Sequence, residues 1–167
     1  PGAYEIKSTA TLFTSLYYFN GPSYNGSLRN IKLIRNNKEI ATIDFYDYLL
    51  KGKQLNDQTL QRDDVIFIPK RGNTVSVIGE INRPAIYELK DSDRLKNLIE
   101  IAGGLKNTTY LDRIKIDRIL PDEKRTKRGI DRIVIDINLS DDYEKKEKFK
   151  LLDGDIIEFF KISDGPK

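Results

Sequence analysis

The sequence repeats itself at a spacing of 83 residues, and this repeat constrains the fold more than any other feature of the chain. The aligned segments are, in order, 1–35 with 84–118, 43–45 with 135–137, and 60–66 with 151–157. Ten of the first 35 aligned pairs are identical, and most of the remaining apolar pattern is kept in the same order. We therefore predict two tandem domains of one fold, at residues 1–72 and 73–167.

Each repeat carries the pattern of a short strand followed by a helix. The strands are expected at residues 3–6 and 85–89. The apolar residues of the second helix recur at i, i+3, i+4 and i+7, which is typical of an amphipathic helix; they are Leu95, Leu98, Ile99 and Ala102. We expect Asp91 or Ser92 as its N-cap and Gly103-Gly104 at its end. In the first helix Leu12, Leu16 and Phe19 are expected to face inward, with Gly21-Pro22 ending it.

A hairpin and a last strand follow in both repeats. Asn36-Asn37 suits the positive φ angles of a type I′ turn between strands that include Ile31 and Phe45. In the second repeat, Ile114 and Ile116 should pair with residues 133–137 around a longer charged loop at 121–129. The last strands are expected at 64–68 and 155–159. An extra strand at 75–79 precedes the second repeat only, so the first repeat lacks its N-terminal strand. The predicted fold class is α+β, with two tandem β-grasp domains, each a small mixed sheet with one helix across a face.

Three motifs of the second repeat resemble a known family. They are Val75-x-Val77-x-Gly79-Glu80-Ile81-x-Arg83-Pro84-x-x-Tyr87, Leu95-x-x-Leu98-Ile99-x-x-Ala102-Gly103-Gly104-Leu105 and Asp153-Gly154-Asp155-Ile156-Ile157. They resemble the soluble-ligand-binding β-grasp (SLBB) domain. The tandem arrangement, with residues 26–31 and 43–52, is similar to the Wza-like outer-membrane polysaccharide export proteins.

This resemblance implies a function and a set of partners. It implies a periplasmic, outer-membrane-associated translocon for capsule or exopolysaccharide, in which copies form a ring, commonly an octamer, around the exported glycan. An inner-membrane polysaccharide co-polymerase is a further implied partner. The export domain that normally precedes the tandem is not in this sequence. The start at Pro1-Gly2 and the absence of methionine lead us to expect a piece of a longer protein, anchored through other parts.

The composition argues against several classes of function. Cysteine and histidine are absent, which removes thiolate nucleophiles, disulfides, zinc-finger sites and a Ser-His-Asp triad. There is no apolar run near the roughly 18 residues that would span a bilayer. The 29 basic and 26 acidic residues are interspersed, so nucleic acid is not an indicated partner. We expect no catalytic residues, no cofactor and no metal: the chain is predicted not to be an enzyme.

Candidate contact residues for a glycan or a neighbouring subunit are of two kinds. Exposed tyrosines can stack on the C–H face of a sugar ring, and Tyr17 is expected to face outward more than Tyr18. Basic and amide side chains can bind hydroxyl or carboxylate groups. The candidates are Tyr17, Tyr24, Arg29, Asn30, Lys124, Arg125, Lys127 and Arg128. The alternative is that these residues bind nothing: the tyrosines pack at the surface, and the basic run of the 121–129 loop is only solvated.

Other conspicuous residues have structural explanations. Arg35 and Arg118 align, which favours a shared structural ion pair. Acidic residues at 63–64 and 153–155 enter the last strands, where Asp favours turns by bonding its own backbone. Tyr4 and Tyr87 align on strands and are expected to be buried or half-buried.

Two other functions remain open from the sequence. One is a module that binds a glycan or another small soluble ligand outside any channel. The other is a nucleic-acid binder of the DNA-uptake type. For the 167 residues alone we expect weak or absent oligomerisation.

Overall fold

The computed structural model describes residues 2–125, 131–141 and 148–164. The chain forms two compact units, residues 1–71 and 72–167, and each is described by itself. Across the described residues there are two sheets and three α-helices, which confirms the α+β fold class. None of the described helices has the length and apolar character needed to cross a membrane.

Unit 1 is a small three-stranded sheet with two short helices. Its elements are α1 (Leu12–Ser15), a 3₁₀ turn (Leu16–Phe19), β1 (Ile31–Arg35), β2 (Lys38–Ile43), α2 (Phe45–Lys51) and β3 (Val65–Phe67). The strand order is β2-β1-β3 and both pairings are antiparallel. Asn36 and Asn37 have φ angles of 50° and 60°, so the two-residue turn between β1 and β2 adopts the predicted left-handed conformation.

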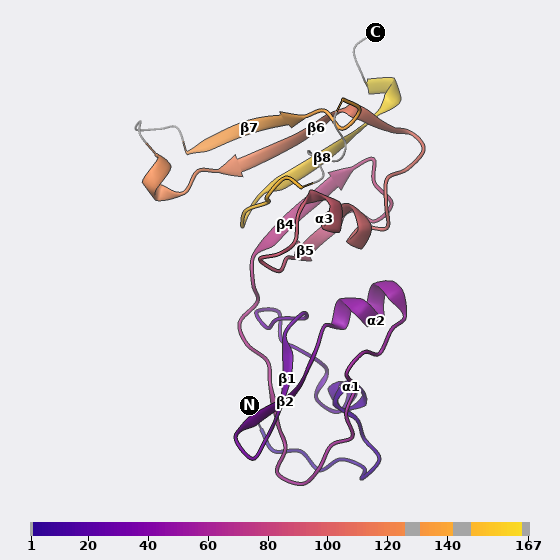
Figure 1. Ribbon diagram of the computed structural model, residues 1–167, viewed down its shortest axis with the longest axis vertical. Helices are drawn as coiled ribbons and strands as arrows, with labels where there is room; N and C mark the ends of the chain where they lie inside the picture. The colour runs from indigo at the N-terminus through magenta and orange to yellow at the C-terminus, as the bar shows by residue number, and fades with distance from the viewer. Residues whose placement is uncertain (1, 126–130, 142–147, 165–167) are drawn as a thin grey trace. The chain divides into compact units, whose positions relative to one another are not determined.

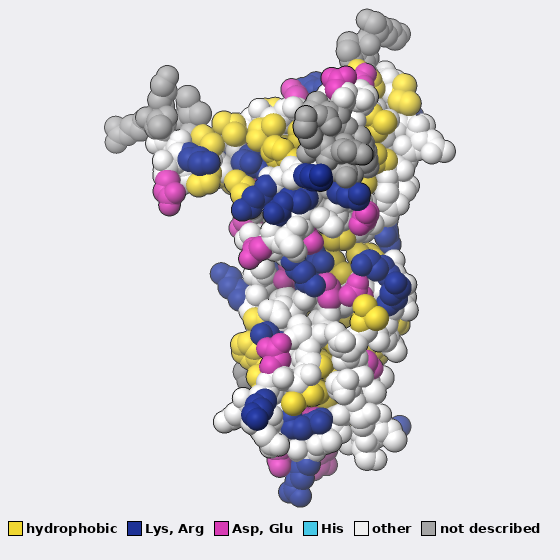
Figure 2. All heavy atoms as spheres, in the orientation of Figure 1, with side chains coloured by type: hydrophobic (Ala, Val, Ile, Leu, Met, Phe, Trp, Pro, Cys, Tyr) yellow, Lys and Arg dark blue, Asp and Glu magenta, His cyan; other side chains and the backbone are white. Residues whose placement is uncertain are grey.

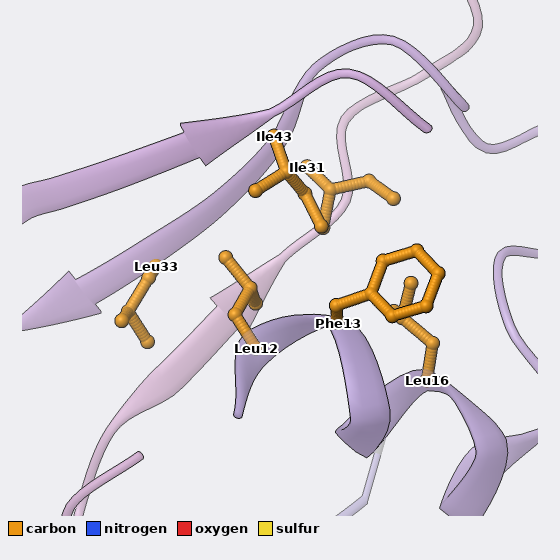
Figure 3. Close-up of a cluster of buried hydrophobic side chains, with 6 residues drawn as sticks. All are labelled: Leu12, Phe13, Leu16, Ile31, Leu33 and Ile43. Atoms are coloured by element: carbon orange, nitrogen blue, oxygen red, sulfur yellow. The ribbon is translucent and has the colours of Figure 1, made fainter. Parts of the chain in front are cut away.

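The core of unit 1 lies between the sheet and the helical segment 12–19, as Figure 3 shows. Six side chains are buried there: Leu12, Phe13, Leu16, Ile31, Leu33 and Ile43. Burial of each such side chain contributes about 1.5–3 kcal/mol relative to leaving it exposed. The helical segment ends where Asn20 and Gly21 take φ angles of 61° and 71°, at the position predicted for its end.

Three expectations for unit 1 are wrong. Residues 3–6 are not a strand, and Tyr4 is 58% exposed. In unit 2 the equivalent strand is hydrogen-bonded only to β4, whereas no described strand of unit 1 occupies the place of β4. Without that neighbour the amides of residues 3–6 have no ladder to join. The third error concerns Phe45, which begins α2 instead of ending a strand.

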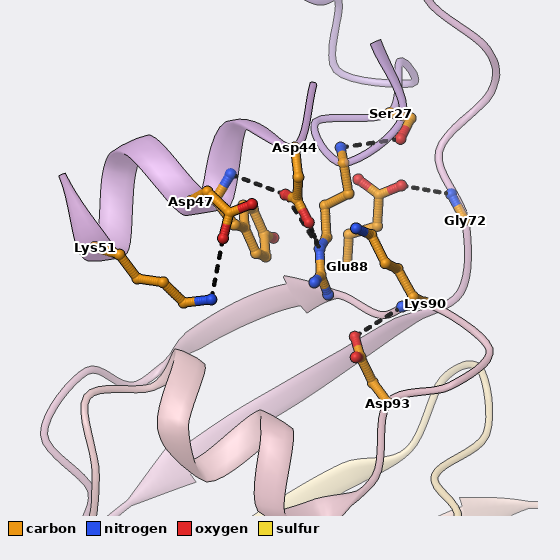
Figure 4. Close-up of polar contacts among 10 residues, drawn as sticks. Ser27, Asp44, Asp47, Lys51, Gly72, Glu88, Lys90 and Asp93 are labelled. Atoms are coloured by element: carbon orange, nitrogen blue, oxygen red, sulfur yellow. Dashed lines mark hydrogen bonds and ion pairs between the residues drawn. The ribbon is translucent and has the colours of Figure 1, made fainter. Parts of the chain in front are cut away.

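Local signals explain why α2 forms after β2. The Asp44 carboxylate accepts a hydrogen bond from the Tyr46 amide at 3.0 Å, as an N-cap does. Asp47 and Lys51 form an ion pair at i, i+4, and Gly52 closes the helix with a φ of 65° (Figure 4). The apolar alternation of Ile43 and Phe45 is the pattern of a strand. The strand β2 nevertheless ends at Ile43, because Asp44 is the N-cap of α2.

Unit 2 is a five-stranded mixed sheet. Its elements are β4 (Thr74–Gly79), β5 (Ala85–Glu88), α3 (Leu95–Ile101), β6 (Thr109–Ile119), a 3₁₀ turn (Asp122–Lys124), β7 (Arg132–Ile137), β8 (Ile156–Lys161) and a second 3₁₀ turn (Ile162–Asp164). The strand order is β5-β4-β8-β6-β7, with β4 parallel to β8 and the other pairs antiparallel. Ile114 lies opposite Ile137, and Ile116 opposite Ile135, as predicted.

Helix α3 covers one face of this sheet (Figure 1). Its predicted apolar face is buried, and Gly103 and Gly104 follow it with φ angles of 84° and 85°. The predicted N-caps, Asp91 and Ser92, are wrong. The helix begins after Arg94, whose amide donates to the Asn97 side chain at 2.9 Å. A mixed sheet crossed by one helix is a β-grasp-like arrangement.

Candidate functional site

The aligned arginines form the same ion pair in each unit. Arg35 donates from Nε and a terminal nitrogen to both carboxylate oxygens of Asp64, each at 2.8 Å. Arg118 binds Asp155 in the same bidentate way, at 2.9 and 2.7 Å. Each guanidinium also donates to the backbone oxygen five residues before its aspartate, at Thr59 or Lys150. The predicted shared ion pair is confirmed, and we call each of the two a clasp.

The clasp aspartates also shape the turn that leads into the last strand. Asp64 accepts from the amide of Gln61 at 2.7 Å, and Asp155 from that of Leu152 at 2.9 Å, so both bond their own turn as expected. The hydrogen bond from Arg35 is the main cause that holds the pKa of Asp64 below its ordinary value. Both carboxylates are thus engaged in structural hydrogen bonds and ion pairs.

The motif that follows β4, residues 79–83, holds the end of α3 in place. The Arg83 amide donates to Ala102 O at 2.9 Å, and its guanidinium donates to Ile101 O at 3.2 Å. Asn82 donates from its side chain to Gly103 O at 2.8 Å. These donors satisfy carbonyl groups that the helix end leaves free. The Gly103-Gly104 pair is therefore a helix cap and not a phosphate cradle.

Gly79 is required by the approach of a neighbouring strand. A β-carbon at this position would lie 2.0 Å from the backbone oxygen of Phe159, and the φ angle of 85° also disfavours other residues. The close approach brings the amide of Glu80 to 2.8 Å from that same oxygen. The hydrogen bond from Glu80 thus joins the end of β4 to β8 before the chain continues into β5.

The structure separates the candidate residues of unit 1. Tyr17 and Tyr24 are 69% and 80% exposed, and Tyr18 is less exposed than Tyr17, as predicted. Asn30 is exposed as well. Arg29 is only 9% exposed: its Nε is 3.1 Å from an Asp44 oxygen, and its guanidinium carbon is 4.9 Å from the centre of the Tyr46 ring. Arg29 thus contributes to the packing around α2.

The arginine that lies beside Tyr24 is Arg71. Its guanidinium carbon is 5.0 Å from the centre of the Tyr24 ring. The two residues are 47 positions apart, and their contact follows from backbone pairing of the loop after Pro22 with the end of unit 1. Nothing in the local sequence indicates this pairing, so sequence reasoning selected Arg29 and missed Arg71.

The charged loop of unit 2 is described only at its start. Lys124 and Arg125 are exposed, and Arg125 is tied back by hydrogen bonding to Leu120 O at 2.7 Å and by an ion pair with Asp122 at 2.6 Å. Lys127 and Arg128 lie outside the described residues.

A shallow groove of about 330 Å³ lies beside β2 in unit 1. Its lining is mostly polar and consists of Glu39, Ile40, Ala41, Thr42, Asn56 and Gln58. Glu39 accepts hydrogen bonds from Lys32 and Thr42, both at 2.7 Å, and the bond from Lys32 is the main cause that lowers the pKa of Glu39. None of the candidate residues from the sequence lines this groove. Within the described ranges, no group of three or more acidic, histidine or cysteine side chains is arranged to hold a metal ion.

Comparison with known proteins identifies part of unit 2. The family model of the SLBB domain matches residues 74–131, which run from β4 to the loop before β7. No curated protein matches the chain significantly. The matched segment contains the Gly79–Arg83 motif and α3, whose contacts are given above. Residues 74–131 therefore contain an SLBB domain, a module associated with binding and transport rather than with catalysis.

Proposed function

We propose that this chain is a non-enzymatic, periplasmic part of a polysaccharide export translocon. In this role the two units build the wall of the conduit and contact neighbouring copies. The observation that carries the proposal is the SLBB domain in unit 2, together with the recurrence of its local contacts in unit 1.

The recurrence extends beyond the clasps to the backbone. In both units the amide of the first helical residue donates to a carbonyl that precedes the last strand. A glycine beyond the helix end donates back to a helical carbonyl. The matched donor–acceptor pairs are Leu12–Gln58 with Leu95–Phe149, and Gly21–Leu16 with Gly104–Ile99. Both N-caps are also closed by the side chain three residues on, Thr14 or Asn97. This agreement supports two units of one kind in tandem, the arrangement on which the export function depends.

The chemistry of the motif residues also supports a role without catalysis. Gly79, Arg83 and the clasp pairs are engaged by backbone or ionic partners inside their own units. The exposed surface of each unit is therefore what remains available for contacts with other molecules. The proposed partners are other copies of the chain, the exported polysaccharide, an inner-membrane polysaccharide co-polymerase, and the outer membrane through other parts of the protein.

Deletion of the gene in its source organism tests this function. We expect polysaccharide to disappear from the cell surface and to accumulate inside the envelope, both measured by chemical sugar analysis of cell fractions. Reintroduction of the intact gene should restore export. Unchanged surface polysaccharide in the deletion strain would overturn the proposal.

The groove beside β2 favours a second candidate, a module that binds a small hydroxyl-rich ligand. Amide, hydroxyl and carboxylate groups around an apolar Ile40 are the groups that bind sugars. Titration of the chain with neutral oligosaccharides, followed by the NMR shifts of Asn56 and Gln58, distinguishes this candidate. A nucleic-acid role requires a continuous basic face. On the face that Figure 2 presents, several basic side chains gather across unit 2 with acidic side chains at their margin, and a salt-dependent gel shift tests that role.

A further inference from the structure

Tyr24 and Arg71 are held together by a short two-stranded ribbon within unit 1. The amide of Arg71 donates to Asn25 O at 2.8 Å, and the amide of Ser27 donates to Pro69 O at 2.8 Å. Between these bonds Gly26 faces Lys70 in an isolated antiparallel bridge. The ribbon therefore fixes the backbone at Arg71 and next to Tyr24 before any ligand arrives.

Packing beneath the ribbon adds to its rigidity. A β-carbon at Gly26 would lie 3.0 Å from the Ile68 side chain and 3.3 Å from that of Pro22. The loop thus rests directly on its neighbours. Binding to such a preorganised surface costs less conformational entropy than binding to a mobile loop.

The Tyr24–Arg71 pair differs from the other arginine–aromatic pairs in the described part of the chain. The described residues form three other such pairs, and in each of them the arginine also binds a carboxylate. They are Arg29–Tyr46 with Asp44, Arg113–Phe160 with Asp136, and Arg118–Phe149 with Asp155. The guanidinium of Arg71 has no carboxylate partner among the described residues, and its Nε is buried without a hydrogen bond. Among the large hydrophobic residues that the structure describes, Tyr24 is also the most exposed, at 80%.

The two segments of the ribbon carry a net positive charge in sequence. The ribbon segments 22–27 and 68–71 contain no acidic residue, and Lys70 adds a second positive charge beside Arg71. The same segments offer the hydroxyl of Ser23 and the amide of Asn25. A guanidinium binds a carboxylate through paired hydrogen bonds, and an exposed tyrosine ring can stack on the apolar face of a sugar.

We propose that the Tyr24–Arg71 pair binds an acidic sugar, a uronic acid residue of the exported polymer. The sugar carboxylate supplies the anionic partner that an aspartate supplies to the other three arginines, and it binds the terminal nitrogens of Arg71. The sugar ring packs on Tyr24. This inference rests on the proposed export function and narrows its substrate class to anionic glycans.

Titration of the 167-residue chain with trigalacturonate tests the site, with NMR shifts as the readout. We expect saturable binding in the millimolar range or tighter, with the largest shifts at residues 23–26 and 70–71. Arg71→Gln and Tyr24→Ala should each weaken binding about tenfold or more, a loss of about 1.4 kcal/mol. The methyl ester of the same trisaccharide, which lacks the charge, should bind at least tenfold more weakly than the acid.

Two variants serve as matched controls. Tyr4→Ala removes another exposed tyrosine, and Arg62→Gln removes an arginine whose side chain is 95% exposed. Neither should change the affinity for trigalacturonate. Equal binding of acid and ester, or equal loss in all four variants, overturns the site.

The outcomes separate the site from the export function. A deletion strain that fails to export, combined with no binding of trigalacturonate, removes the Tyr24–Arg71 site and leaves the export function standing. A deletion strain that exports normally removes the function, whatever the titration shows. When both hold, Arg71→Gln in cells should reduce the surface polymer while the protein level stays unchanged.

Discussion

At the scale of single residues, the stability of each unit depends on a few positions that accept only one type of residue. Gly79 allows the backbone of β4 to approach Phe159 O, and the two clasps each join the end of a hairpin strand to the turn before the last strand. These positions belong to the framework of the units. Tyr17, Tyr24 and Asn30, by contrast, are exposed, so substitutions there should have little effect on this framework.

Substitution of Gly79 by alanine should destabilise unit 2 strongly. The added β-carbon would meet Phe159 O at 2.0 Å, so backbone must move, and we expect a loss of more than about 3 kcal/mol in the free energy of unfolding. Gly104→Ala is the matched control, because its φ is also 85° but its nearest neighbour is the Asn82 side chain at 3.9 Å. It should cost only about 1–2 kcal/mol. Urea unfolding measures both, and similar losses would contradict the steric explanation.

Substitution of Asp64 by asparagine should destabilise unit 1 in a way that depends on pH. Because Arg35 lowers the pKa of Asp64 in the folded state, the carboxylate contributes stability above its unfolded pKa of about 3.9. That contribution is lost as the pH falls through the lower, folded value. At pH 7 we expect a thermal midpoint about 5–10 °C below that of the unmodified chain. The gap should narrow steadily as the solution is acidified below about pH 4.

The neighbouring aspartate provides the control for this experiment. The side chain of Asp63 is 92% exposed, and asparagine tolerates its positive φ of 64°. Asp63→Asn should leave the thermal midpoint within about 2 °C at every pH. A difference between Asp64→Asn and the unmodified chain that stays constant with pH would show that the clasp charge is unimportant.

At the scale of elements, the open edge of β3 is the main difference between the two sheets. In unit 2, β8 has β6 on one side and β4 on the other, whereas β3 has only β1. Val65 and Phe67 on β3 are 55% and 48% exposed. An unpaired strand edge can accept a further strand.

Addition of a copy of residues 74–83 directly before Pro1 should complete this sheet. The added segment has the chemistry of β4 and would place a parallel strand beside β3 and an antiparallel one beside residues 2–5. We expect slower amide hydrogen exchange at Val65–Phe67, burial of Tyr4 and a higher thermal midpoint for unit 1. The same extension with aspartate at both valine positions should give none of these effects. If both extensions behave alike, the explanation for the missing strand is wrong.

Much of the element plan could be predicted because its signals are local or repeated. The spacing of Leu95, Leu98 and Ile99 indicates a helix, Asn36-Asn37 indicates a tight hairpin, and the alignment of Arg35 with Arg118 indicates a shared ion pair. Signals of these kinds act over a few residues or are confirmed by the second copy. The structure agrees with them for that reason.

The errors arise where the outcome depends on distant chain. Residues 3–6 have a strand pattern, but a strand needs a neighbour that the pattern does not reveal. The alternation of Ile43 and Phe45 indicates a strand, although Asp44, which lies between them, is the N-cap of α2. The contact of Tyr24 with Arg71 depends on the pairing of two segments that the sequence alone does not bring together.

At the scale of the whole molecule, ion pairs between neighbouring strands lie on the exposed face of the sheet in unit 2. The face of the five-stranded sheet that carries Val134 also carries salt bridges between strands: Arg113–Asp136, Lys115–Glu158 and Arg132–Asp117. Charged groups of this kind disfavour the large apolar contact that a stable oligomer uses.

The 167-residue chain on its own should therefore be mainly monomeric at micromolar concentration. Light scattering coupled to size exclusion should give a mass close to 19.3 kDa. The expected weak self-association should appear only as the concentration rises. A stable octamer formed by these residues alone would contradict this expectation, and would mean that the ring contacts lie within the two units.

The clasps have one more consequence, which concerns how long each unit can be. The arginine and the aspartate are 29 positions apart in unit 1 and 37 in unit 2, yet the joint is the same. The entropy of closing a chain segment grows only with the logarithm of its length, so the difference costs about 0.2 kcal/mol. The stretch between Leu120 and Asp131, whose backbone groups meet at 2.8 Å, is thus a place where the chain can lengthen at little cost. A foreign segment inserted there, such as an epitope or a fluorescent reporter, would mark the protein while its sheet stays closed.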